Sequence, residues 1–269
     1  MSTNPFAAPP APPYAPLPAT PAFKPIDGLQ YLRMYQYIFE NPNWVTNVLL
    51  AALCGLIPVI GPLVLLGYQY EVVIALLMTG GRRYPDFDFN RFADLLIRGL
   101  WPFLVQLVAS LVLMVPLMFI IMVPFVVLMA LAGNAQDNAA LGIIAVIGFI
   151  VWGLLLIPIS ILPAMILIPM QIRAGLAMDF ATAFHFGWIM DFVKKTWLEM
   201  FLGLLFLSFT AMLLGMLGYV ACIVGLFFVM PLIYLAQAHL LYELYLLFLS
   251  RGGEAVAIKH SPAPQPVKH

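Results

Sequence analysis

The chain has 269 residues, of which 64% are hydrophobic and 9% are charged, and its formal net charge is zero. A soluble domain carries roughly 25% charged residues, so this composition excludes a soluble fold and predicts a membrane protein. The neutral charge argues against nucleic acid as a partner. The two cysteines, Cys54 and Cys222, lack the spacing of a metal site or a disulfide framework, and we interpret both as small apolar core residues.

Proline-rich segments flank the apolar part of the chain. Residues 1–26 combine many prolines with Ala, Ser and Thr, and residues 251–269 end in SPAPQPVKH. This composition predicts extended, solvated and disordered tails. The tails could dock protein partners through their prolines, although plain disorder is the simpler interpretation. We therefore expect one helical membrane domain at residues 27–250.

Residues 27–43 open this domain as a short amphipathic helix in the lipid headgroup region, with Asp27 as its N-cap. The apolar run 45–79 follows, and the motif IPVIGP in its middle predicts a break. We expect a helical hairpin, with Val45–Leu56 going out and Pro62–Thr79 returning. A re-entrant outward arm and a single broken span are the alternatives.

The next part of the chain repeats this pattern. A polar loop leads to a second interfacial helix at residues 89–98, and the apolar runs 99–131 and 140–172 follow, separated by the loop GNAQDN at 133–138. Each run is longer than one perpendicular span needs, so we expect tilt or kinks. Both runs contain prolines, which membrane helices tolerate when neighbouring groups bind the freed carbonyls.

The third interfacial segment is predicted at residues 173–196, followed by two spans within 197–250 and a turn between Gly215 and Gly225. Four aromatic residues at four-residue spacing predict a stripe that faces the membrane: Phe180, Phe184, Trp188 and Phe192. The expected fold is therefore an all-α integral membrane protein. It has about six transmembrane helices arranged as three hairpins, each preceded by an interfacial amphipathic helix.

Basic residues predict the orientation in the membrane. A six-helix arrangement places all of them on one side, and they are Lys24, Arg33, Arg82, Arg83, Arg91, Arg98, Arg173, Lys194, Lys195, Arg251, Lys259 and Lys268. By the positive-inside rule this side is the cytoplasm, with both termini there. A single broken span at 45–79 would instead leave Lys24 and Arg33 outside. The expected interfacial anchors are Trp44, Arg82, Arg83, Trp101, Trp188 and Trp197.

The two ends of the domain also resemble each other. Phe39 and Trp44 have the same spacing as Phe192 and Trp197, and a Tyr-Glu pair precedes a Gly-Gly pair at equal distance in both halves. The repeated order suggests a duplicated unit. A parallel duplication would place Glu71 and Glu243 at the same depth in the membrane.

Several short motifs resemble one protein family. The segments FENPNW, IPVIGPLVLLGYQYEVV and YPDFD are similar to those of a prokaryotic membrane family known as domain of unknown function 4013. The resemblance covers roughly Ile38 to Leu249, although Tyr84 stands where family members tend to have an aliphatic residue. It implies a multi-pass helical fold in the cell (inner) membrane. It implies no catalytic residues.

Glu71 and Glu243 are the candidate functional residues. Each lies inside an apolar helix, where a carboxylate is costly unless it is buried in the bundle, protonated, paired or hydrated. We expect both to point into the bundle, with a tyrosine, Gln69 or His239 nearby. A neutral acid there predicts that replacement by Gln is mild. A structural role in helix packing is an equal alternative.

Three functions fit these observations. The first is a non-enzymatic protein that organises lipids or partner proteins, which we favour because no reactive motif occurs in the sequence. The second is a small-molecule or ion transporter or channel that uses Glu71 and Glu243. The third is an intramembrane enzyme, for which His239 with Glu243 is the only candidate pair. That pair is a weak metal signal, so we expect neither a metal nor a cofactor.

Overall fold

The computed structural model describes residues 26–134, 138–220 and 224–259. These residues form α-helices and two short 3₁₀ helices, and they contain no strand. The elements in chain order are α1 (Arg33–Glu40), α2 (Trp44–Gly55), α3 (Ile60–Thr79), η1 (Phe89–Arg91), α4 (Phe92–Gly133), α5 (Ala139–Ala177), η2 (Ala181–Phe184), α6 (Phe186–Val220) and α7 (Val224–Ser250). The predictions for Cys222, for residues 1–25 and for residues 260–269 lie outside the described residues.

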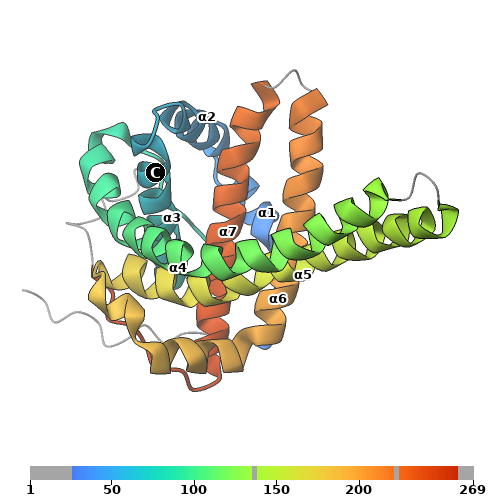
Figure 1. Ribbon diagram of the computed structural model, residues 1–269. Helices are drawn as coiled ribbons and strands as arrows, with labels where there is room; N and C mark the ends of the chain where they lie inside the picture. The colour runs from blue at the N-terminus through green and yellow to red at the C-terminus, as the bar shows by residue number, and fades with distance from the viewer. Residues whose placement is uncertain (1–25, 135–137, 221–223, 260–269) are drawn as a thin grey trace, which may run out of the picture.

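Helix α7 lies at the centre of the fold, where it contacts α1, α2, α3 and α6 (Figure 1). Helices α4 and α5 pair with each other and form a long arm that projects past α6. They contain 42 and 39 residues, or about 60 Å each at 1.5 Å per residue, twice the thickness of a bilayer core. The prolines inside them do not end either helix.

In the part of the chain that the structure describes, five helices are long and apolar enough to cross a membrane: α3, α4, α5, α6 and α7. This confirms an all-helical, multi-pass membrane fold. Helix α2 has 12 residues, or about 18 Å, which is too short to cross a bilayer by itself. The predicted break is confirmed, since α2 ends at Gly55, α3 begins at Ile60, and Val59 between them has a φ of 65°.

The first predicted interfacial helix packs one face against the rest of the fold and leaves the other exposed. Helix α1 buries Met34, Tyr37 and Ile38, and the Tyr37 hydroxyl donates to the Leu235 carbonyl of α7 at 2.6 Å. Asp27 is not the N-cap, because α1 begins after Leu32. The amphipathic pattern identified a buried face correctly, but protein covers that face.

The other two interfacial predictions also change. Residues 92–98 are the first turns of α4 and not a separate helix. The aromatic stripe faces the core, since the rings of Trp188 and Phe192 lie 4.9 and 4.8 Å from the Phe248 ring of α7. Trp188 and Phe192 are 3% and 0% exposed. The prediction that this stripe faces the membrane was wrong, because α7 supplies the apolar surface that covers it.

The chain beyond α7 is described as far as residue 259, and it contacts the helices over residues 254–259. The Val256 amide donates to the Tyr245 hydroxyl at 2.8 Å, and the Lys259 amide donates to the Leu176 carbonyl at 2.9 Å. Val256 and Ile258 pack against the apolar core. These contacts hold residues 254–259 against α5 and α7, and the apolar run Ala255–Ile258 is the sequence signal for this packing.

Helices α3 and α4 cross with their backbones in contact at two glycines. A Cβ atom at Gly67 would lie 1.8 Å from the Leu95 carbonyl oxygen, and one at Gly99 would lie 1.9 Å from the Leu63 carbonyl oxygen. Small residues permit such close approach in membrane bundles, where dispersion between helices supplies much of the association energy. The crossing sets the position of α4 and of the side chains on its first turns.

We expect Gly67→Ala to lower the midpoint temperature of unfolding, because the added methyl group must separate the two backbones. Overpacked cores lose about 1–3 kcal/mol. The measurement is thermal unfolding in detergent followed by tryptophan fluorescence. The matched control is Gly153→Ala in α5, where no atom lies within 4 Å of the added Cβ. Equal midpoints for the two variants would contradict the close contact.

Candidate functional site

Glu71 lies in an ion-pair cluster between α3 and the start of α4. Its side chain is 10% exposed, and one carboxylate oxygen accepts from Arg91 Nη2 at 2.6 Å. The same oxygen lies 3.6 Å from Arg98 Nε, a distance that gives charge attraction without a hydrogen bond. The expectation that Glu71 points into the bundle is confirmed. Its partners are two arginines, whereas we expected Gln69, His239 or a tyrosine.

Arg98 joins three separate parts of the chain, although it is only 1% exposed. Besides facing Glu71, it donates to the Gly175 carbonyl of α5 at 3.4 Å and to the Lys259 carbonyl at 3.1 Å. A buried guanidinium is costly unless its charge is balanced and its donors are bound. Glu71 supplies the opposite charge, and each carbonyl accepts one hydrogen bond, from Nη1 and Nη2, while the buried Nε faces Glu71 without a hydrogen bond.

Glu243 also points into the bundle and is 4% exposed. One carboxylate oxygen accepts from the Gln30 backbone amide at 3.0 Å, and the other lies 3.7 Å from Nδ1 of His239. His239 is therefore the neighbour that the sequence predicted. Among the described residues no group of three His, Cys, Asp or Glu side chains could hold a metal ion.

The two glutamates do not lie at equal positions along the bundle. Gln69 donates to the Tyr234 carbonyl at 3.4 Å, and a Cβ at Gly81 would lie 2.8 Å from the Tyr242 hydroxyl, so α3 and α7 run parallel. A duplication with equal depths would place Tyr70 level with Tyr242. Gly81 lies beside Tyr242 instead. Glu71 lies two residues after Gln69 and is therefore level with about Ala236, seven residues or about 10 Å before Glu243 along α7. The prediction of equal depth was wrong, because the two helices pack with this offset.

Asp86 organises the loop between α3 and η1. Its carboxylate accepts from the side-chain amides of Asn41, Asn43 and Asn47 at 2.8 to 3.1 Å. Loss of water around Asp86 favours the neutral acid, but the three amide donors outweigh this effect and lower its pKa. Burial raises the pKa of Tyr84 to about 12, so its hydroxyl keeps the proton that it donates to the Ile38 carbonyl at 2.9 Å.

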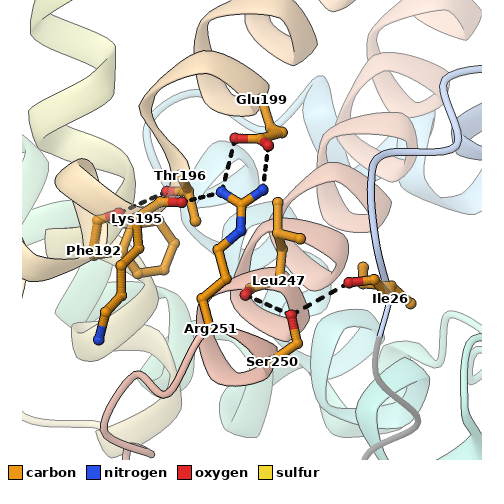
Figure 2. A network of polar contacts seen from close by, with 8 residues as sticks. All are labelled: Ile26, Phe192, Lys195, Thr196, Glu199, Leu247, Ser250 and Arg251. Atoms are coloured by element: carbon orange, nitrogen blue, oxygen red, sulfur yellow. Dashed lines mark hydrogen bonds and ion pairs between the residues drawn. The ribbon is translucent and has the colours of Figure 1, made fainter.

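A second polar network joins α6, the end of α7 and the start of the described chain (Figure 2). Arg251 binds both carboxylate oxygens of Glu199 and the Lys195 carbonyl. Ser250 donates to the Ile26 carbonyl at 3.3 Å. The sequence analysis placed Arg251 in a disordered tail, whereas its guanidinium links the end of α7 to α6.

The predicted anchors lie in different surroundings. Arg82, Arg83 and Trp197 are exposed, and Trp44 and Trp101 are partly buried. Trp188 is buried, and its indole N–H donates to the Glu254 carbonyl at 2.9 Å. The prediction that Trp188 anchors the protein at the membrane interface was wrong, because this indole binds the chain beyond α7.

A cavity of about 350 Å³ lies between α3, α4, α5 and α7. Gln69 lines it, together with three glutamines that the sequence analysis did not select, Gln106, Gln171 and Gln237. Each of these is the single amide of its helix and has apolar residues on both sides in the sequence, a pattern that marks costly intramembrane polar groups and could have identified them. Glu71 and Glu243 do not line this cavity.

A family model described as "Protein of unknown function (DUF4013)" matches residues 50–224, well over half of the chain. The chain belongs to this family. No curated protein and no solved structure matches it. The resemblance read from the sequence motifs is thus confirmed, although the matched segment ends before the expected limit at Leu249.

The match divides the polar groups of this DUF4013 protein into two sets. Glu71 and both of its arginine partners lie within the matched residues, as do Gln69, Gln106 and Gln171. His239 and Glu243 lie outside them, on the C-terminal helix. The α3–α4 cluster and most of the amide-lined cavity therefore belong to the part that the family model describes.

We expect Glu71→Gln to destabilise this DUF4013 protein strongly, because it leaves two arginines without a counter-charge. Breaking a buried ion pair costs about 3–5 kcal/mol. This revises the mild effect expected when Glu71 was considered as a neutral acid. The expectation of a mild effect remains for Glu243→Gln, since Gln keeps an acceptor for the Gln30 amide.

The measurement is thermal unfolding in detergent. The matched control is Glu40→Gln, because Glu40 pairs with Arg33 at the surface, where the side chains are 45% and 33% exposed. Exposed pairs contribute about 0–1 kcal/mol. If Glu71→Gln unfolds at the same temperature as Glu40→Gln, the cluster does not carry the proposed charge balance.

Proposed function

We propose that this DUF4013 protein is a non-enzymatic component of a prokaryotic cell membrane that organises lipids or partner proteins. The observation that carries the proposal is the exposed apolar arm formed by α4 and α5 (Figure 1). The polar residues of α4 and α5 contact the rest of the fold. The distal half of the arm presents only apolar side chains over long stretches.

The distal half of the arm has almost no cover from the rest of the chain. Large side chains on both of its helices are more than half exposed, among them Leu111, Val112, Met118, Phe119, Val126, Ile143, Val146, Ile150 and Leu154. Apolar surface costs about 25 cal/mol per Å² in water. Exposed apolar patches of this kind mark contacts with a membrane or another protein. Lipid or partner helices must therefore cover the arm.

The transporter alternative receives less support. Such a mechanism needs a hydrated path to Glu71 or Glu243, yet both carboxylates bind partners within the fold. The intramembrane enzyme needs a reactive pair that faces a cavity. Neither His239 nor Glu243 lines the two cavities described for the chain. Both glutamates thus support helix packing in this proposal.

Contacts between the basic segments support a location of both termini in the cytoplasm. The segment 26–43 contacts 80–98 through Tyr84 and Asp86, and 80–98 contacts 173–199 through Arg98. Arg98 and Arg251 then bring residues 250–259 into the same group. Since basic residues favour the cytoplasmic side, this arrangement fits an inner-membrane protein with both ends inside.

We expect native lipids or partner proteins to remain bound to the arm when the membrane is extracted as polymer-bounded discs. The matched variant lacks residues 121–154. It shortens both helices to the same level, because Leu128 faces Gly148 and the rings of Phe125 and Phe149 are 6.2 Å apart. Mass spectrometry of lipids and proteins is the measurement. An unchanged set of bound molecules in the shortened variant would contradict the proposal.

Cysteine labelling tests the orientation. In a background with Cys54 and Cys222 replaced by alanine, a membrane-impermeant maleimide applied to intact cells should label Asn134→Cys and should not label Asp27→Cys. Both positions are exposed, and permeabilised cells, which serve as the control, should show labelling of both. Labelling of Asp27→Cys in intact cells would place the N-terminus outside.

A further inference from the structure

The amide-lined cavity has unused hydrogen-bonding groups. Gln171 Nε2 donates to Gln106 Oε1 at 3.0 Å, and Gln69 Nε2 donates to the Tyr234 carbonyl at 3.4 Å. Gln237 and Tyr234 also line the cavity, and neither side chain forms a hydrogen bond with another described residue. An amide offers two donors and one acceptor oxygen, and a phenol offers a donor and an acceptor. Polar groups left unpaired in an apolar fold are costly, which favours a bound polar group there.

The wall of this cavity carries no charge. Its described lining residues are Pro62, Leu66, Gln69, Phe103, Gln106, Leu107, Ser110, Gln171, Tyr234 and Gln237. An ionised ligand would lose its hydration without gaining a counter-charge, at a cost on the order of several kcal/mol. The chemistry therefore fits an uncharged ligand with hydroxyl or carbonyl groups.

An apolar cavity of about 200 Å³ adjoins the amide-lined cavity, and the two share Pro62 and Tyr234 in their walls. The side chains lining the second cavity include Leu65, Phe227 and Met230. A polar space beside an apolar one matches a molecule with a polar end and a hydrocarbon chain. Ligand sites typically enclose about 300–1,000 Å³, a range that the first cavity alone reaches.

The amide-lined cavity borders an apolar surface. The cavity is part-open, and Leu107 in its wall is 45% exposed beside Val108, which is 40% exposed. Both belong to α4, the helix that forms the apolar arm. A ligand that enters here comes from the hydrocarbon phase and not from water.

We propose that the amide-lined cavity binds the uncharged glycerol ester end of a monoacylglycerol, with the acyl chain in the adjoining apolar cavity. Gln237 and Tyr234 bind the ester and hydroxyl groups, and Gln69 and Gln106 line the rest of the polar space. This inference rests on the proposed function, since it names one class of membrane lipid that the protein holds.

The test uses a monoacylglycerol with a photoreactive diazirine in its acyl chain, added to the full-length protein in lipid discs. Labelling should saturate and should map to peptides of α3 and α7. Excess monooleoylglycerol should compete. Oleate, which has a similar chain and a negative charge, and glycerol, which lacks the chain, should not compete. Equal competition by oleate would overturn the uncharged specificity, and labelling without saturation would overturn the site.

Gln237→Leu tests the cavity itself. Because Gln237 binds no described side chain or backbone group, the variant should fold like the parent while the half-saturating probe concentration rises roughly fivefold, as expected for one lost hydrogen bond. The control Gln36→Leu makes the same change on the exposed face of α1 and should leave binding unchanged. A second variant, Tyr234→Phe, removes only a hydroxyl and should weaken binding to a similar degree. Unchanged binding in both cavity variants would overturn the proposal.

The same preparations separate the two proposals. Lipid retention by the α4–α5 arm is measured by mass spectrometry and does not depend on the cavity. Arm-dependent retention without saturable photolabelling would overturn the monoacylglycerol site alone. Loss of both would overturn the site together with the proposed function.

Discussion

The backbone contact between Gly67 and Gly99 is the constraint on which the polar interior depends. Each glycine leaves space for a carbonyl oxygen of the other helix. Arg98 directly precedes Gly99, and Glu71 lies one helical turn after Gly67. The closeness of the two backbones therefore brings the guanidinium and the carboxylate together at 3.6 Å. With any larger residue at the crossing, α4 would move away and both charges would lose their partners.

From this pair, contacts extend through the charged part of the molecule. Arg98 reaches Gly175 and Lys259, and the segment ending at Lys259 packs beside Tyr245 of α7. In an apolar surrounding a charged group is costly unless its charge is balanced and its donors find acceptors. For Arg98 the fold supplies the Glu71 carboxylate and two carbonyl groups from segments far apart in the chain, while Nε remains without a hydrogen bond.

The polar groups of the amide-lined cavity are uncharged, unlike those of the Glu71 cluster. Amides cost less to bury than charges and can remain partly unpaired. Gln171 donates one hydrogen bond to Gln106, whereas the side chains of Gln237 and Tyr234 bind no other described residue. The charged cluster thus stabilises the helix packing, and the amide cluster leaves a space that suits an uncharged ligand. Both clusters use α3 and α4, and Arg98 and Gln106 lie about two helical turns apart along α4.

The sequence by itself determined the membrane class, the break between α2 and α3, and the family. Composition, a proline-glycine motif and short motifs are local properties, and no distant contact alters them. It also indicated that Glu71 and Glu243 point inward, since exposure to lipid would be too costly.

Only the tertiary structure decided what covers each apolar face. The stripe of Trp188 and Phe192 meets Phe248, and the face of α1 meets α7, while a helical pattern specifies a buried face without specifying its cover. It likewise decided that Glu71 binds Arg91 and Arg98, and that four amides from four helices share one cavity. These pairings depend on the offset and crossing of helices, which are set by packing between residues remote in the chain.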